Sequence, residues 1–298
     1  MCGIAGYLDP GCGAADRESA VRRMCAAMAH RGPDEEGLRS QGPLTLGLRR
    51  LAIFDPANGH QPMTSPDGRL VLVFNGAIYN FRDLRRDLEP HWPFRTACDT
   101  EVLLAAYARW GSDCLDRLRG MYAFAVWDAA ESSLFLARDP FGIKPLYYRR
   151  DGERLLFASE LTGLYASGAA RPEIDPAAVS DYLGWFAVPA PRTIYRDSFA
   201  LRPGECATLR EGRLQTRRTW SFGAIAPAGA ICSSRADFIA ELRARLEDAV
   251  KAHLSADVPV GAFLSGGLDS AAIVGLMTRV GGGRLRTFSI GFDEPGCS

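Results

Sequence analysis

A series of strand-like apolar segments, with few helices between them, constrains residues 2–220 more than any other feature of the sequence. The run Leu70–Phe74 is wholly apolar and predicts a buried strand, and the Asn75-Gly76 pair that follows is typical of a tight turn. Strands that do not alternate regularly with helices favour an α+β or layered antiparallel architecture. Further strands are predicted at 121–128, 133–137 and 155–158, and helices at about 20–29 and 101–110.

A different pattern begins after residues 221–234, a segment rich in small residues that we interpret as a linker. Ser234 and Asp237 have the spacing of a helix-capping box, and apolar residues from Phe238 to Val250 recur every three or four positions, which predicts a helix with one buried face. A strand, a Gly-rich loop, a helix and a second strand then make one βαβ unit of a parallel sheet. Because two strands do not form a stable sheet alone, residues 235–298 are interpreted as the first portion of an α/β domain.

Composition excludes several classes of protein. Hydrophobic residues make up 47% and charged residues 23% of the 298, and the 35 basic residues balance the 35 acidic ones, which argues against nucleic-acid binding. No apolar run approaches the length of a membrane span. The eight cysteines form no C-x-x-C pair and the four histidines no H-E-x-x-H, so no metal ligands are predicted. We expect a cytoplasmic protein without a membrane partner.

Cys2 is the first candidate for catalysis. If Met1 is removed, one residue carries both a thiol and a free α-amine, whose reference pKa of about 7.7–8.0 suits proton exchange near neutral pH. Nucleophiles activated by their own N-terminal amine work in this way. Taken by its position alone, a second-position cysteine has no necessary function.

Four further residues have both a structural and a catalytic interpretation. Asn75 and Gly76 form either a hairpin turn or an oxyanion site, in which the Asn side-chain amide and the Gly backbone N–H are the two donors. Arg50 is either a solvated charge or a fork for a carboxylate. Asp99, before Thr-Glu-Val-Leu-Leu, is either a helix N-cap or a ligand for an ammonium group.

The loop Ser265-Gly266-Gly267-Leu268-Asp269-Ser270 is the candidate for phosphate binding. Glycines between a strand and a helix let backbone N–H groups approach a phosphate, and the helix N-terminus adds positive charge. The alternative is an ordinary strand-to-helix turn with Ser or Asp as the cap. The loop is not a Walker A sequence, because G-x-x-x-x-G-K-[ST] is absent.

The order of these motifs resembles a known family. Met1-Cys2-Gly3-Ile4-Ala5-Gly6, His30-Arg31-Gly32-Pro33-Asp34, Arg50-Leu51-Ala52-Ile53, Phe74-Asn75-Gly76, Asp99-Thr100-Glu101-Val102, Arg138-Asp139-Pro140-Phe141-Gly142 with Pro145-Leu146-Tyr147-Tyr148, and Phe157-Ala158-Ser159-Glu160 follow one another. Together they resemble the class II glutamine amidotransferase domain of glutamine-hydrolysing asparagine synthetase. The loop at Ser265–Ser270 resembles the pyrophosphate loop that opens the ATP-dependent synthetase domain of that family.

The resemblance implies a fold and a set of roles. Residues 2–220 would be an N-terminal-nucleophile glutaminase domain, a four-layer αββα sandwich, and residues 235–298 the start of a Rossmann-like nucleotide hydrolase domain. Cys2 would attack the amide of glutamine, with Asn75 and Gly76 as oxyanion donors, and Arg50, Leu51, Ile53 and Asp99 would hold the substrate. Ammonia would then amidate aspartate activated by ATP with Mg²⁺. Leu264, Ser265, Gly266, Gly267, Asp269, Ser270 and Ile290 would bind ATP and pyrophosphate.

Two departures from the family pattern leave alternatives open. The first is Ala77, which stands where the family has Glu. The second is length: the family continues beyond residue 298, so we expect a C-terminally truncated chain that performs glutamine hydrolysis unaided. Asparagine formation would need the missing portion, either from a longer chain or from a partner. A homodimer, or a chain that supplies the missing synthetase portion, is the expected assembly. A different acceptor (a sugar, a peptide or a natural product) and a non-catalytic fragment that docks on a full-length synthetase are the other hypotheses.

Overall fold

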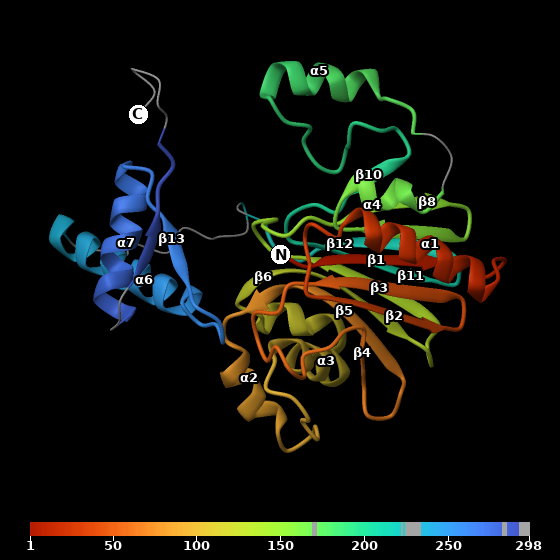
Figure 1. Ribbon diagram of the computed structural model, residues 1–298, viewed down its shortest axis with the longest axis horizontal. Coiled ribbons are helices and arrows are strands. Elements are labelled where there is room, and N and C mark those ends of the chain that lie inside the picture. The colour runs from red at the N-terminus through yellow and green to blue at the C-terminus, as the bar shows by residue number, and fades with distance from the viewer. Residues whose placement is uncertain (169–171, 222, 224–233, 282–284, 292–298) are drawn as a thin grey trace. The chain divides into compact units, whose positions relative to one another are not determined.

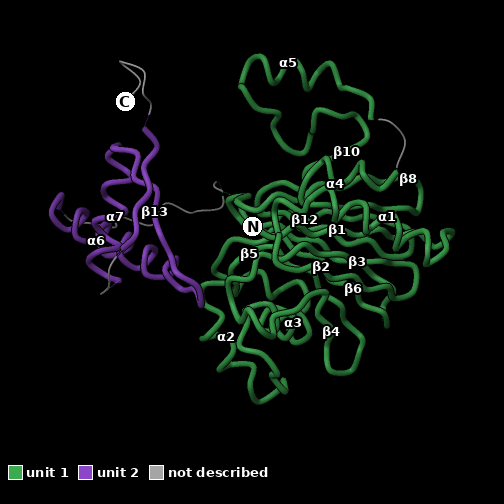
Figure 2. The backbone as a smooth tube through the Cα atoms, in the orientation of Figure 1, with its two compact units in different colours: residues 1–224 green, residues 225–298 purple. Residues whose placement is uncertain are grey.

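The computed structural model describes residues 1–168, 172–221, 223, 234–281 and 285–291. The chain divides into two compact units, residues 1–224 and 225–298, which Figures 1 and 2 display. Most of the linker predicted at 221–234 lies outside the described residues.

Two six-stranded antiparallel sheets form the centre of unit 1 (Figure 1). The strand order is β10-β8-β9-β1-β3-β2 in the first sheet and β12-β11-β7-β6-β5-β4 in the second. The first sheet contains β1 (Gly3–Leu8), β2 (Glu35–Gln41), β3 (Leu44–Arg50), β8 (Tyr147–Asp151), β9 (Arg154–Ala158) and β10 (Ser198–Ala200). The second contains β4 (Met63–Thr64), β5 (Leu70–Ile78), β6 (Gly120–Asp128), β7 (Ser133–Arg138), β11 (Glu205–Arg210) and β12 (Arg213–Arg218).

Helices cover the outer faces of the two sheets. One apolar core joins the sheets face to face, a second lies between the first sheet and helices α1 (Ala14–Ala27) and α4 (Leu161–Ala166), and a third lies under α2 (Phe81–Leu88) and α3 (Asp99–Trp110). The 3-10 helix η1 (Gly111–Arg117) follows α3, and α5 (Pro176–Trp185) precedes β10. Unit 1 is therefore the α+β sandwich of four layers that the resemblance predicts.

Strand β5 explains the wholly apolar run at its start. Val71 and Val73 enter the core between the sheets, whereas Leu72 and Phe74 pack in the core with α3, so both faces of the strand are buried. The strand does not stop at Asn75: it pairs with β6 through Ile78, and the interpretation of Asn75-Gly76 as a turn is wrong. Glycine is required at 76 because a Cβ atom there would lie 2.2 Å from the carbonyl oxygen of Met121.

The first helix begins earlier than its apolar spacing predicts, at Ala14 rather than about Ala20. Arg17, in its first turn, is buried and donates hydrogen bonds to the carbonyls of Asp9 (3.1 Å) and Gly42 (2.8 Å). These contacts join the helix start to distant loops, and a local apolar pattern carries no signal for them.

Unit 2 contains α6 (Arg235–His253), β13 (Gly261–Phe263), α7 (Leu268–Gly281) and β14 (Arg286–Phe288), and its two strands are parallel. The predicted cap is present: Ser234 Oγ accepts a hydrogen bond from Asp237 N (3.1 Å). The predicted buried face of α6 is wrong, since Val250 is its one buried residue while Phe238 and Leu242 are 56% and 45% exposed. The remaining described elements, α7 and two short strands, are too few to cover this helix.

Candidate active site

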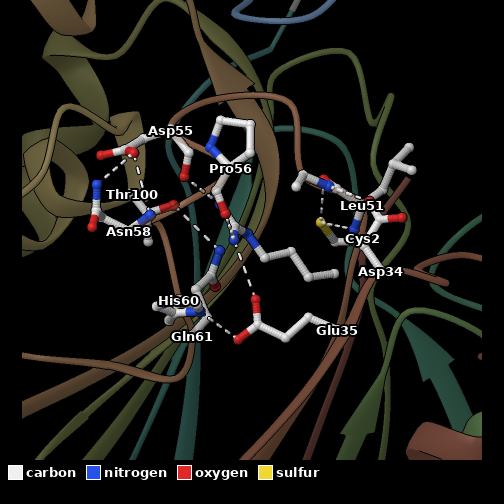
Figure 3. Close-up of polar contacts among 12 residues, drawn as sticks. Cys2, Asp34, Glu35, Leu51, Asp55, Pro56, Asn58, His60, Gln61 and Thr100 are labelled. Atoms are coloured by element: carbon white, nitrogen blue, oxygen red, sulfur yellow. Dashed lines mark hydrogen bonds and ion pairs between the residues drawn. The ribbon is translucent and has the colours of Figure 1, made fainter.

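Cys2 lies at the start of β1, next to the backbone that follows β3. Because β1 pairs with β3 in a register that places Gly3 opposite Arg49, Cys2 comes level with Arg50 and Leu51. Its Sγ accepts a hydrogen bond from Leu51 N (3.4 Å) and donates one to Leu51 O (3.6 Å), as Figure 3 shows. Burial raises the pKa of this thiol above its ordinary value, and the Leu51 N–H opposes that shift. The thiol therefore needs a base close by.

The backbone of Cys2 is held by a charged cluster. Arg31 Nε donates to Cys2 O (2.9 Å), and its Nη1 forms an ion pair with Glu160 (2.9 Å). Glu160 also accepts a hydrogen bond from His30 Nε2 (3.0 Å). The motifs that contain these residues were recognised in the sequence without a role, and the structure brings them together at the N-terminus.

Asn75 and Gly76 reach the same pocket from the opposite sheet. Asn75 is 1% exposed, and its side-chain Nδ2 is buried with no hydrogen-bond partner among the described residues. An unpaired buried donor is costly, so its presence beside a nucleophile is typical of a site that receives a developing negative charge.

Arg50 is buried, which excludes the interpretation of a solvated charge. Its Nη1 donates to Glu35 (3.2 Å) and to the carbonyl of Pro56 (3.0 Å). Its Nη2 donates to the carbonyls of Phe54 (3.1 Å) and Asp55 (2.9 Å). Figure 3 shows how Glu35, Asp55 and Pro56 converge here. A substrate carboxylate would therefore have to replace some of these acceptors.

Asp99 is the first residue of α3, and the N-cap is Cys98, so the N-cap interpretation of Asp99 is wrong. Its Oδ2 accepts a hydrogen bond from Ile78 N (3.0 Å), which fixes the carboxyl beside the end of β5. Burial raises the pKa of Asp99 to about 7, although backbone donors oppose the shift. A buried carboxyl of this kind gains most from an ammonium partner.

One pocket collects every residue predicted for the glutaminase site. Its free volume is about 50 Å³, little more than the share of one water molecule, and Met1 forms part of its wall. The predicted residues that line it are Cys2, Arg50, Leu51, Ile53, Asn75, Gly76 and Asp99. Gln61, Thr100 and Lys144 line it too, and the sequence pattern gave no indication of them.

The second predicted site, the loop Ser265–Ser270 in unit 2, lies exposed on the surface of that unit. Gly266 has a φ of +81°, the left-handed region that favours glycine, and α7 begins at Leu268. Ser265 Oγ and Ser270 Oγ lie 3.1 Å apart, and Ser270 Oγ donates to Gly267 O (3.1 Å). The loop thus has the glycine conformation and hydroxyl groups that fit a phosphate. Asp269 follows in the first turn of α7.

The backbone next to this loop is joined to the end of β14. Leu264 N donates to Phe288 O (2.8 Å), and Ser289 Oγ donates to Leu264 O (2.7 Å). These two hydrogen bonds place Leu264 next to the segment that leads to Ile290, and a nucleotide site flanked by both residues requires this. The side chain of Ile290 is 78% exposed.

The family described as glutamine amidotransferase domain matches residues 1–220, and the family described as asparagine synthase matches residues 241–298. The chain belongs to the glutamine amidotransferase domain family. The resemblance inferred from the motif order is confirmed.

Several curated relatives match over the whole amidotransferase chain. It is 38% identical to asparagine synthetase [glutamine-hydrolyzing] 1 of Bacillus subtilis over 301 residues, which cover 100% of the chain and 47% of the relative. It is 41% identical to a putative asparagine synthetase of Mycobacterium tuberculosis over 322 residues, which cover 100% of the chain and 49% of the relative. The chain thus spans about half the length of these relatives.

Solved structures support the fold of this amidotransferase. Glutamine phosphoribosylpyrophosphate amidotransferase from Bacillus subtilis matches with a TM-score of 0.55 at 19% identity, covering 97% of the chain and 65% of that structure. At this identity the likeness concerns the fold alone.

Two negative findings apply to the described residues of this amidotransferase. In them, no group of three or more His, Cys, Asp or Glu side chains is placed to bind a metal ion. None of their helices combines the length and apolar character needed to cross a membrane.

Proposed function

We propose that this chain hydrolyses glutamine with Cys2 as the nucleophile, after removal of Met1. The observation that carries the proposal is the convergence of all the predicted glutaminase residues on one small pocket beside the N-terminus. The pocket is small while Met1 forms part of its wall, so processing both frees the amine and enlarges the space.

The chemistry follows from the residues at the pocket. Cys2 Sγ attacks the side-chain carbonyl carbon of glutamine while the α-amine accepts the thiol proton. The amine then passes that proton to the leaving nitrogen. The C–N bond breaks, ammonia is released, and the glutamyl group remains on Cys2 as a thioester. Water then attacks the thioester and releases glutamate. Asn75 Nδ2 and Gly76 N–H stabilise the negative oxygen in both steps.

Substrate recognition uses the other predicted residues. Arg50 binds the α-carboxylate of glutamine by exchanging loop carbonyls for it. Asp99 binds the α-ammonium group, and the backbone at Leu51 and Ile53 forms the wall between them. This exchange releases the loop that carries Phe54 and Asp55 from Arg50, so movement of that loop accompanies binding.

We extend the proposal to the whole relatives' reaction. Residues 2–220 are the glutaminase domain, 221–234 a linker and 235–298 the first portion of a synthetase domain in the cytoplasm. The loop at Ser265–Ser270, together with Leu264 and Ile290, would bind ATP with Mg²⁺. ATP would activate the side-chain carboxylate of aspartate as an acyl-adenylate with release of pyrophosphate, and ammonia would then displace AMP to give asparagine. The conformation of Gly266 and the two serine hydroxyls support this assignment. A chain that supplies the remaining synthetase portion would cover the exposed apolar face of α6.

The first test is direct. Intact-mass measurement should find the chain without Met1, and ammonia and glutamate release from glutamine should fall to background in Cys2→Ala. Cys12→Ala is the matched control, because Cys12 is another incompletely buried free thiol and lies outside the pocket. Retained activity in Cys2→Ala, or a mature chain that still starts with Met1, would contradict the proposal. No activity in the wild type would favour the non-catalytic alternative.

A further inference from the structure

Lys144 is a buried ammonium group for which the proposed function has no use. It is 5% exposed, and no carboxylate in the described residues forms an ion pair with it. Its Nζ donates to Met1 Sδ (3.1 Å), and a thioether is a weak acceptor. A buried charge without a partner is costly, and this one loses its acceptor when Met1 is removed. Such a group requires an explanation.

A rigid turn places Lys144 at the N-terminus. The carboxylate of Asp139 accepts hydrogen bonds from the backbone of Phe141 (3.0 Å), Ile143 (3.0 Å) and Lys144 (2.9 Å). Arg138 Nε in turn donates to the carbonyl of Lys144 (2.9 Å). The Arg138-Asp139-Pro140-Phe141-Gly142 motif, to which the sequence assigns no chemistry, thus fixes the backbone from which Lys144 reaches the pocket that holds Met1 and Cys2.

The sequence supports a specific need for lysine here. Lys144 and Lys251 are the two lysines among the 35 basic residues, and Lys251 is exposed on α6. In a chain that otherwise uses arginine, the buried position retains a compact ammonium on a flexible stem, which presents its charge at a point rather than as a planar fork.

We propose that Lys144 is a positioning residue for glutamine hydrolysis: after Met1 is removed, its ammonium faces the α-amine of Cys2 and keeps that amine in the neutral, proton-accepting form. This inference rests on the proposed function. A neighbouring positive charge disfavours protonation of an amine, so the base is available at a lower pH than it would be alone.

Several other charged groups surround this amine. With Met1 present, burial is the main cause that lowers the pKa of the N-terminal amine; Arg31 and Lys144 lower it further, and the Cys2 thiol and Asp34 oppose them. Arg50 and Asp99 act on the Cys2 thiol from β3 and α3. In the mature chain the amine belongs to Cys2, which lines the same pocket as Lys144, and Lys144 is then the cation that has lost its acceptor.

The test compares Lys144→Met with Lys251→Met, the matched control on the surface. Intact mass first establishes that Met1 is absent in each protein. The rate constant kcat at saturating glutamine, where Asp99 is already paired with the substrate, is then measured on both sides of neutral pH. The acid limb is the range in which activity falls as the pH is lowered. In Lys144→Met we expect the midpoint of this limb to move to a higher pH by roughly one unit. Activity on the acid side should then be up to about ten-fold lower than in the wild type, while activity at higher pH should be nearly full. Lys144→Arg keeps a positive charge but spreads it over a planar fork, so it should move the limb less than Lys144→Met does, and Lys251→Met should not move it.

A second measurement guards against a purely structural effect. The pH dependence of Cys2 alkylation by iodoacetamide should shift in the same direction in Lys144→Met, and Lys144→Gln serves as the second neutral variant. Replacing a buried charge by a methionine should not lower the melting temperature. An acid limb that coincides with that of the wild type, or a loss of activity equal at every pH, overturns the inference while leaving the proposed function intact. Absence of activity in the wild type overturns the proposed function instead.

Discussion

In unit 1, Ile4, Leu48 and Phe157 are completely buried, whereas in unit 2 Phe263, Leu268 and Ile290 are 78–85% exposed. The two units have similar local patterns, with apolar strands and helices of ordinary spacing. The difference is in what covers them: each face of the two sheets in unit 1 packs on another layer, and the described elements of unit 2 leave most apolar side chains in solvent.

The candidate sites differ in the same way. The pocket at Cys2 is formed by the N-terminus, β3 and the loop after it, β5, β6, α3 and the turn before β8, so it exists only when unit 1 is folded. The loop at Ser265–Ser270 is held by hydrogen bonds between residues at most five positions apart. A short motif can therefore have its correct local conformation while the domain around it has no closed core.

The largest expected difference between the units concerns their phenylalanines. Phe157 lies in the core between the sheets, and its ring lies where a Cβ atom of residue 6 would be, 2.1 Å away, so Gly6 is part of its packing. Phe157→Ala should lower the free energy of unfolding of unit 1 by about 3–5 kcal/mol. All five tryptophans lie in unit 1, so the urea dependence of their fluorescence measures this loss.

Phe263→Ala is the matched change in unit 2. Because Phe263 is already in solvent, amide hydrogen exchange in α6 and α7 should change by no more than about 0.5 kcal/mol. Slow exchange in β13 and β14 of the wild type, or a large effect of Phe263→Ala, would mean that unit 2 has a core that its exposed residues do not indicate.

Local signals predicted local structure well. The strand pair 121–128 and 133–137 and the cap at Ser234 follow from short-range patterns, and both are present. Asn75-Gly76 was interpreted wrongly because a turn preference is local, while the pairing of β5 with β6 through Ile78 is a long-range interaction that outweighs it.

The sequence predicts which residues line the candidate site but not the contacts that they make. Cys2, Asn75 and Asp99 follow from the order of the motifs. The hydrogen bonds from Arg50 to the loop carbonyls depend on the tertiary structure, which motif spacing does not indicate. Lys144 carried no signal as a candidate site residue, since a turn far along the chain brings it to the N-terminus that it contacts.

Burial in unit 1 should make glutamine binding depend on pH. Asp99 has a pKa of about 7 because it is withdrawn from solvent, and it must be ionised to pair with the ammonium group of glutamine. Below that pKa binding requires the loss of a proton, so Kd should rise by up to about ten-fold for each pH unit of acidification. Calorimetry with Cys2→Ala measures Kd without turnover.

Asp99→Asn should bind weakly and with a flat pH profile, while Asp87→Asn, at an exposed position of α2, should behave like its parent. If Kd still depends on pH in Asp99→Asn, another group controls binding. Burial of Asp99 is then not the cause of the pH dependence.

Among the changes that should have a measurable effect, the smallest concerns helix caps, and it tests whether packing or local hydrogen bonding stabilises each helix. Helices α1 to α4, which pack on the sheets, have no side-chain hydrogen bond at the N-cap. Two poorly buried helices, α5 and α6, each have one: Ala177 N donates to Asp175 Oδ1 (3.0 Å), and Asp237 N donates to Ser234 Oγ (3.1 Å). Ser234→Ala and Asp175→Ala should each lower the stability of their helix by about 1 kcal/mol, which corresponds to about five-fold faster amide exchange.

The extent of that change along α6 separates the two explanations. Because a helix without tertiary packing depends on its own local interactions, the faster exchange in Ser234→Ala should extend along α6. An effect limited to the first turn would mean that packing against α7 stabilises α6 more than its exposed apolar residues indicate.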